Sequence, residues 1–187
     1  MKRLQLLLKF SLASMLTLLI CLPAFSYKVG NTDLVKNGSG TRTKYMMKVY
    51  MATLYVPEEL KGASDTDILN ADKPMAIDIL ITSGLITKER FLESIGGAFD
   101  KSAEAGYPCS DKQNYINLFN DIAIADGDTV SHRYDPAKGF SVVFTPKGGQ
   151  AKTLGTLKGL PTKKAFFGIF ISSKPINDTL KKNMLGK

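Results

Sequence analysis

The stretch from Thr41 to Val56 constrains the fold of this chain more than any other. It reads TRTKYMMKVYMATLYV, is rich in Tyr, Val, Thr and Met, and contains no Gly or Pro. Such a composition predicts a long β-strand or a tight hairpin. Alternate residues of a strand point to opposite faces, and here both faces are largely apolar. We therefore expect a strand that is covered on both sides.

The rest of the chain predicts one domain of mixed secondary structure. The expected elements are strands over 74–81 and across 129–157, and helices over 87–105, from 110 onward and from Pro175 onward. Gly96 and Gly97 weaken the helix over 87–105, so we expect close packing against another element to hold it. This order of strands and helices predicts an α+β fold, with helices packed on an antiparallel sheet.

The first 26 residues have the pattern of a secretory signal peptide. Basic residues precede an apolar run of about 13 residues, which is shorter than the roughly 20 that span a bilayer. The small residues Ala24 and Ser26 fit the positions before a cleavage site. We expect cleavage before Tyr27, a single mature domain over 27–187, and a periplasmic or secreted protein without stable membrane insertion. An uncleaved N-terminal anchor is the alternative.

Composition argues against several kinds of function. The 25 basic residues exceed the 17 acidic ones, but the lysines are scattered and export argues against a nucleic-acid partner. One histidine and two cysteines leave too few side chains for most metal sites or for a Ser-His-Asp triad. We expect a monomer with no metal and no cofactor.

Two separated blocks of sequence carry a further signal. The first reads NGSGTRTK over 37–44 and continues as KVYMATLYV over 48–56; the second reads FFGIF over 166–170 and KPINDTLK over 174–181. In order and position these blocks resemble the small exported bacterial branch of the chalcone isomerase-like family, across nearly all of the mature chain. The resemblance implies an open-faced β-sandwich, in which a long antiparallel sheet is covered by helices on one face, with a ligand cleft between them.

The same resemblance implies a binding site. In the family's plant enzymes an arginine and a threonine help to position the substrate; Arg42 matches the arginine, and Tyr50 stands at the threonine position. The family's fatty-acid-binding branch holds a carboxylate with such an arginine and tyrosine. A guanidinium can grip a carboxylate through two parallel hydrogen bonds, and a phenol adds one donor. We expect Arg42 and Tyr50 to bind a fatty acid or a similar amphipathic carboxylate, against the alternatives of a surface arginine and a core tyrosine.

Met47, Phe91 and Ser94 are weaker candidates for the same pocket. Methionine is flexible and suits a greasy pocket of variable shape, although core filling is its commoner use. The resemblance places Phe91, Ser94 and Ala98 where the plant enzymes carry tyrosine, lysine and asparagine. Because none of these groups is kept, we expect no catalytic residues. An isomerase (intramolecular lyase) acting on chalcone-like substrates and a partner-binding accessory protein of the cell envelope are the alternatives.

One geometric condition applies to the expected site. Eight residues along a straight strand span about 26 Å, too far for Arg42 and Tyr50 to hold one carboxylate. The chain must therefore fold back or bend between them. A tight turn near 43–44, or a bulge permitted by Gly38 and Gly40, would shorten the distance.

Overall fold

The centre of the molecule is an antiparallel sheet of seven strands, in which each strand pairs with the next one along the chain. The computed structural model describes residues 27–44 and 46–187, and the predicted signal peptide over 1–26 lies outside the described residues. The strands are β1 (Tyr27–Val29), β2 (Thr32–Lys44), β3 (Met47–Val56), β4 (Met75–Ile81), β5 (Thr129–Asp135), β6 (Gly139–Thr145) and β7 (Lys152–Leu157). The expected strands over 74–81 and across 129–157 are confirmed, and 41–56 contains the end of β2 and the whole of β3, which pair as a hairpin.

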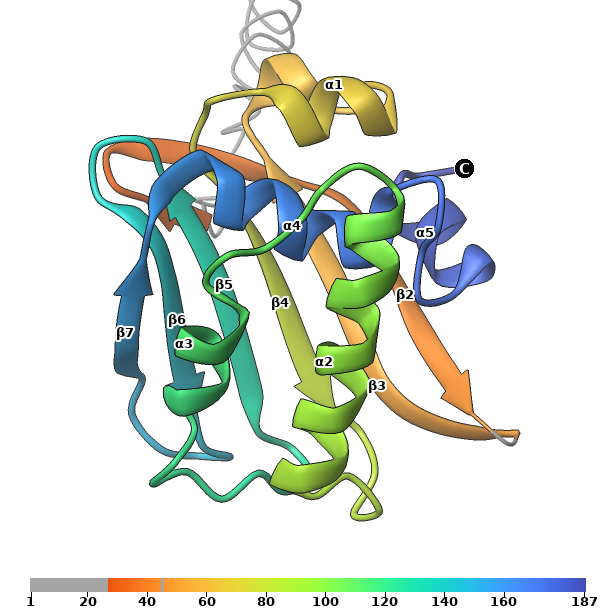
Figure 1. Cartoon of the computed structure of the whole chain (residues 1–187), viewed down its shortest axis with the longest axis vertical. Helices are drawn as coiled ribbons and strands as arrows, with labels where there is room; N and C mark the ends of the chain where they lie inside the picture. Colours follow the sequence, from red (N-terminus) through yellow and green to blue (C-terminus); the bar gives the residue numbers. More distant parts are fainter. Residues whose placement is uncertain (1–26, 45) are drawn as a thin grey trace, which may run out of the picture.

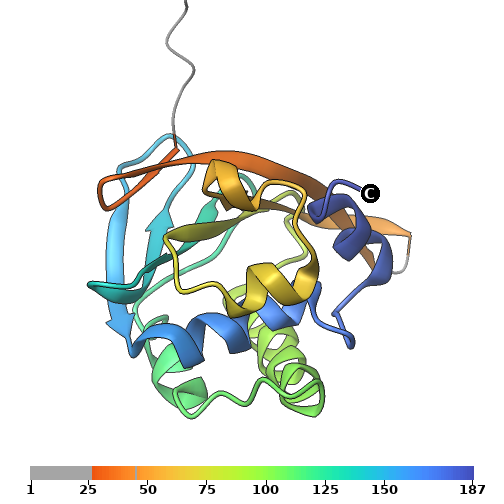
Figure 2. The same ribbon diagram turned by 90° about the horizontal axis from the view of Figure 1, so that it is seen from above.

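Helices cover the concave face of this sheet. The helical elements among the described residues are the short 3-10 helix η1 (Glu58–Leu60) and the α-helices α1 (Asp65–Asn70), α2 (Lys88–Glu104), α3 (Lys112–Asn117), α4 (Gly159–Ile171) and α5 (Asp178–Met184), and of these α1 packs against α4. Figure 1 shows α2, α3 and α4 in front of the strands, and Figure 2 shows the sheet curled around them. The predicted α+β fold, with helices on one face of an antiparallel sheet, is confirmed. In the part of the chain described, no helix is long and apolar enough to cross a membrane.

The last helix begins later than expected. Pro175 lies outside it, and Asn177 is the N-cap, whose side-chain oxygen accepts a hydrogen bond from the Leu180 backbone N–H at 2.8 Å. An asparagine cap satisfies one of the unpaired N–H groups in the first turn, which proline cannot do. The segment before the helix is held by a bond of 2.7 Å from the Ile176 N–H to the carbonyl of Ile169.

Helix α2 packs against another element, α4, as expected, but the close approach is not at its two glycines. A Cβ at Gly97 would meet no atom within 4 Å, and one at Gly96 would make only an ordinary contact. The closest contact between α2 and α4 is formed at Gly168 of α4, where a Cβ would lie 2.3 Å from the Ser102 hydroxyl of α2. That hydroxyl donates a 2.8 Å hydrogen bond to the carbonyl of Ala165. The glycine that matters for this contact is therefore in α4.

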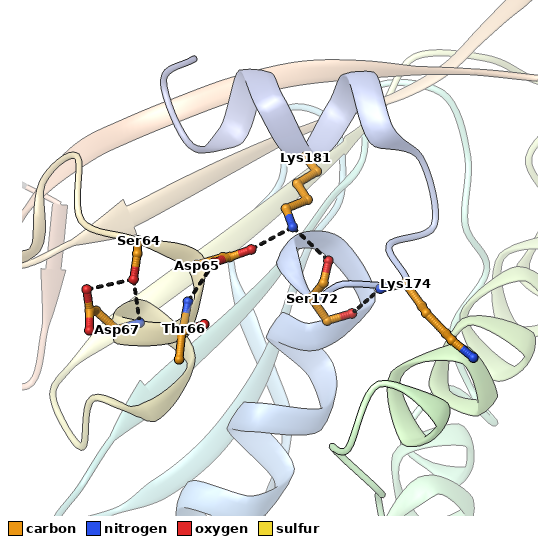
Figure 3. A network of polar contacts seen from close by, with 7 residues as sticks. All are labelled: Ser64, Asp65, Thr66, Asp67, Ser172, Lys174 and Lys181. Atoms are coloured by element: carbon orange, nitrogen blue, oxygen red, sulfur yellow. Dashed lines mark hydrogen bonds and ion pairs between the residues drawn. The ribbon is translucent and has the colours of Figure 1, made fainter.

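Helix α5 is fixed to three other elements. The ammonium of Lys181 lies 2.6 Å from the carboxylate of Asp65 in α1 and donates to the carbonyl of Ser172, just after α4 (Figure 3). The hydrogen bond from Lys181 lowers the pKa of the Asp65 carboxyl. On the sheet side, the Asn37 amide of β2 donates to the carbonyl of Met184 at 2.8 Å. The end of the chain is thus held against β2, near the beginning of the domain.

A buried histidine lies at the centre of the core. The ring of His132 stacks on Phe166 with 3.8 Å between centroids, and its Nε2 lies 2.9 Å from the hydroxyl of Tyr115. Burial lowers the pKa of His132 to about 3. The imidazole is therefore neutral at physiological pH, and protonation of this buried ring would destabilise the fold.

Acidification should expose this dependence. Between pH 6.5 and 4.5 the unfolded chain takes up a proton at His132 that the folded chain refuses, so the free energy of unfolding should fall by up to about 1.4 kcal/mol per pH unit. In His132→Gln this slope should be absent above pH 4.5. The chain has one histidine, so its imidazole NMR signal is unambiguous. A native-state signal that titrates near pH 6.5 would contradict the prediction.

Candidate functional site

The β2–β3 hairpin brings Arg42 and Tyr50 together. They are direct cross-strand partners, so eight residues of separation in the sequence become one step across the sheet. The reversal follows Lys44, which pairs with Met47, and is therefore slightly beyond the turn expected near 43–44. The geometric condition set by the sequence is met by a hairpin.

A bulge in β3 adjusts the direction of the two side chains. Tyr50 pairs with Arg42 and Lys48 pairs with Thr43, so Val49 is an extra residue without a partner opposite it. A bulge of this kind interrupts the strict alternation of strand faces. Val49 and Tyr50 are consecutive, yet both are buried and both line the same cleft. A second register shift, between Lys36 and Gly38, lies near the predicted glycines but away from this pair.

Arg42 reaches across the cleft to α2. Its Nη1 donates a 2.6 Å hydrogen bond to the hydroxyl of Ser94, and its guanidinium carbon lies 5.7 Å from the centroid of the Tyr50 ring. A guanidinium has five N–H donors in a rigid fork, so the bond to Ser94 leaves others for a ligand. The role of Ser94 in the cleft is therefore to position the Arg42 side chain.

Tyr50 is a buried phenol whose hydroxyl has no hydrogen-bond acceptor among the described residues, because the neighbouring Arg42 guanidinium can only donate. Its side chain is only 3% exposed. Burial raises the pKa of Tyr50 above its usual value of 10, and the nearby Arg42 opposes this in part. The hydroxyl therefore keeps its proton and remains a donor. A buried polar group left unpaired costs about 1 to 3 kcal/mol, so this hydroxyl calls for an acceptor that the chain does not supply.

Both residues line a cleft of about 620 Å³ between the β2–β3 hairpin and α2. The structure also brings Met47, Phe91 and Ser94 to its walls, so the five residues predicted for a site share one cavity. Its remaining walls are formed by Lys44, Val49, Leu85, Ile86, Arg90, Glu93, Ile95, Gly97, Ala98, Lys101 and Ile176. Apolar groups line most of it, and the cations outnumber the single acid, Glu93. The cleft can thus accept an apolar body with an anionic end.

Sequence reasoning missed the cations of α2. Arg90 and Lys101 lie on the cleft together with Ser94 and Gly97. Positions 90, 94, 97 and 101 follow the helical spacing of one face, so Ser94 alone would have identified the others. Among the described residues, no group of three or more His, Cys, Asp or Glu side chains converges as a metal site would require.

Comparison with known proteins gives this arrangement a context. The chain matches the family model described as chalcone isomerase-like over residues 21–186. It belongs to the chalcone isomerase-like family. Among solved structures, this chalcone isomerase-like protein is similar to a fatty-acid binding protein from Arabidopsis thaliana, with a TM-score of 0.60 and 19% identity over 86% of this chain and 90% of that one. No curated protein sequence matches it. The likeness shows that the predicted chalcone isomerase-like fold is correct.

Proposed function

We propose that this protein binds a fatty acid or a similar amphipathic carboxylate in the cleft, without catalysing a reaction. The observation that carries the proposal is the buried, unpartnered hydroxyl of Tyr50 directly across the hairpin from the Arg42 guanidinium. A carboxylate beside this pair would accept two hydrogen bonds from Arg42 and one from Tyr50. The similarity in fold to a fatty-acid binding protein supports the same ligand class.

The shape and lining of the cleft fit the rest of such a ligand. Small-molecule sites commonly have volumes of about 300 to 1,000 Å³ and are mostly apolar with a few placed polar groups. The cleft, at about 620 Å³, falls in this range. Val49, Phe91, Ile95 and Ile176 offer apolar contacts to an acyl chain that leads away from the carboxylate.

Two side chains of the cleft favour binding over isomerisation. Phe91 and Ala98 both line it, and neither carries a side-chain group that can donate or accept a hydrogen bond. At these two positions the resemblance places the tyrosine and asparagine of the plant enzymes, so the groups it associates with their catalysis are missing here. The N-terminal pattern supports export, so we further propose that the protein acts in the periplasm or outside the cell after cleavage before Tyr27. Mass spectrometry of the protein recovered from its cells would test this cleavage.

Binding of a fluorescent fatty acid to delipidated protein tests the site. We expect Arg42→Ala to weaken affinity by about 10- to 100-fold, the equivalent of one lost charged hydrogen bond. Tyr50→Phe should weaken it less, by about 3- to 10-fold, while leaving the ligand-free protein as stable as before or slightly more so, because the variant removes an unpaired buried hydroxyl.

Arg133→Ala provides the matched control. Arg133 contacts Tyr27 and is not part of the cleft wall, so its loss should leave fatty-acid affinity unchanged. An affinity of Arg42→Ala equal to that of the unmodified protein would remove the arginine from the site. Turnover of a chalcone above the rate in buffer would instead favour the isomerase.

A further inference from the structure

Two of the exposed apolar side chains of this protein line the cleft, and a third is adjacent in the sequence to one of them. Within the described residues, the large apolar side chains that remain exposed are Met46, at 97%, Met47, at 45%, and Leu85, at 47%. Met47 and Leu85 are themselves part of the cleft wall, and Met46 directly precedes Met47. Single exposed apolar residues are ordinary on protein surfaces, but a group of them at the mouth of a binding cleft indicates an interaction site.

Met46 is exposed in spite of an unfavourable backbone. Its φ is +64°, in the left-handed region that favours glycine or asparagine, and it lies in the short connection between β2 and β3. Asparagine would suit this turn better and would be better solvated. The ends of β2 and β3 extend beyond the helices that cover the sheet (Figure 1), and the Met46 side chain in the turn between them is exposed.

Basic side chains lie next to these apolar groups in the sequence or on the wall of the same cleft. Lys48 is exposed one residue after Met47, and Arg90 and Lys101 lie on the facing wall of the cleft, where Glu93 is the acid. Apolar tips among basic side chains are typical of protein segments that lie in the interface of an anionic bilayer. Lysine and arginine near such a surface are attracted by its negative potential, while a neutral lipid surface offers no such attraction.

We propose that the mouth of the cleft docks reversibly on an anionic lipid surface. Met46, Met47 and Leu85 would enter the boundary between headgroups and acyl chains, and Lys48 and Arg90 would contact the headgroups. An acyl chain would then pass between bilayer and cleft without crossing water. This passage rests on the proposed fatty-acid binding, whereas the docking itself does not.

Vesicle co-sedimentation of the full mature domain tests the docking. The protein should bind vesicles that contain phosphatidylglycerol at least about 10-fold more strongly than vesicles of phosphatidylcholine alone, and the difference should shrink in high salt. Met46→Asn, which keeps a residue suited to the turn, should weaken binding by about 5- to 10-fold, and Lys48→Glu should do the same. Neither residue belongs to the cleft wall, so both variants should keep their fatty-acid affinity in solution.

Lys138→Glu is the control, since Lys138 is exposed in the β5–β6 connection, away from the cleft. It changes net charge by the same amount as Lys48→Glu and should bind vesicles almost as well as the unmodified protein. The docking would be overturned if the protein did not bind phosphatidylglycerol vesicles, or if Met46→Asn bound them as well as the unmodified protein. An equal loss of vesicle binding in all three variants would overturn it too. Vesicle binding that follows the expected pattern without any fatty-acid binding would uphold the docking and refute the proposed function.

Discussion

Replacing Lys163 with methionine should lower the free energy of unfolding by about 1 to 3 kcal/mol, the cost of leaving buried hydrogen-bond acceptors without a donor. The Lys163 side chain is completely buried in α4. Its ammonium donates to the carbonyls of Ile68, Leu69 and Ala71, at 2.5, 3.0 and 3.1 Å, where α1 ends. Helix ends carry carbonyls without intrahelical partners, and methionine fills the space of lysine but offers no donor.

The loss should also change the pH dependence of stability. Burial lowers the pKa of Lys163 to about 7 from its usual 10.5. Between pH 7 and about 9.5 the unfolded chain holds a proton at this position that the folded chain has released, so the stability of the unmodified protein should gain from Lys163 as pH rises. Lys163→Met should lack this gain, which urea denaturation at several pH values can measure.

Lys164→Met is a suitable control for this experiment. Lys164 is the next residue in α4 and is only half-buried, so its replacement should change stability by no more than about 0.5 kcal/mol. Equal stability of Lys163→Met and Lys164→Met would show that the three carbonyls do not depend on the ammonium.

Gly38→Ala should cost about 3 kcal/mol of stability, at the upper end of what overpacking usually costs. A Cβ at Gly38 would lie 2.2 Å from the carbonyl oxygen of Asn183 and 2.7 Å from that of Met184. Both are backbone atoms of α5, which a side-chain rotation cannot move away. The helix would have to lift from β2, and the hydrogen bond from Asn37 to the end of α5 would be lost with it.

Thermal unfolding measures this effect, and Gly84→Ala is the matched control. A Cβ at Gly84 would meet no atom within 4 Å, so this change should move the free energy of unfolding by less than about 0.5 kcal/mol. If Gly38→Ala unfolds at the same temperature as Gly84→Ala, α5 does not rest on this part of the strand as tightly as described.

Sequence periodicity predicted the types of most elements because the apolar residues follow a strand or a helix period. The helix expected over 87–105 is α2, and its start agrees because Thr87 caps it through a hydrogen bond from the Arg90 N–H. The error at the last helix arose because Pro175 and Asn177 are both favourable start signals, and local sequence does not show which one the neighbouring elements select.

The candidate site was less accessible from sequence. The resemblance located Arg42 and Tyr50, but their pairing depends on where the hairpin turns and on the bulge at Val49, both of which are settled by pairing between strands. The sequence permits a bulge at the glycines of the 37–44 block. Their closest neighbours belong to α5, about 145 residues further along the chain, and such long-range contacts leave no trace in local patterns.

The position of α5 has a consequence for how the protein folds. Because every strand pairs with its successor, the sheet can assemble progressively through local pairings. Helix α5 instead rests on β2, which is distant in the sequence, and Ile176, just before α5, completes a wall of the cleft. The cleft is therefore not finished when the sheet has formed, but only when this long-range contact has been made.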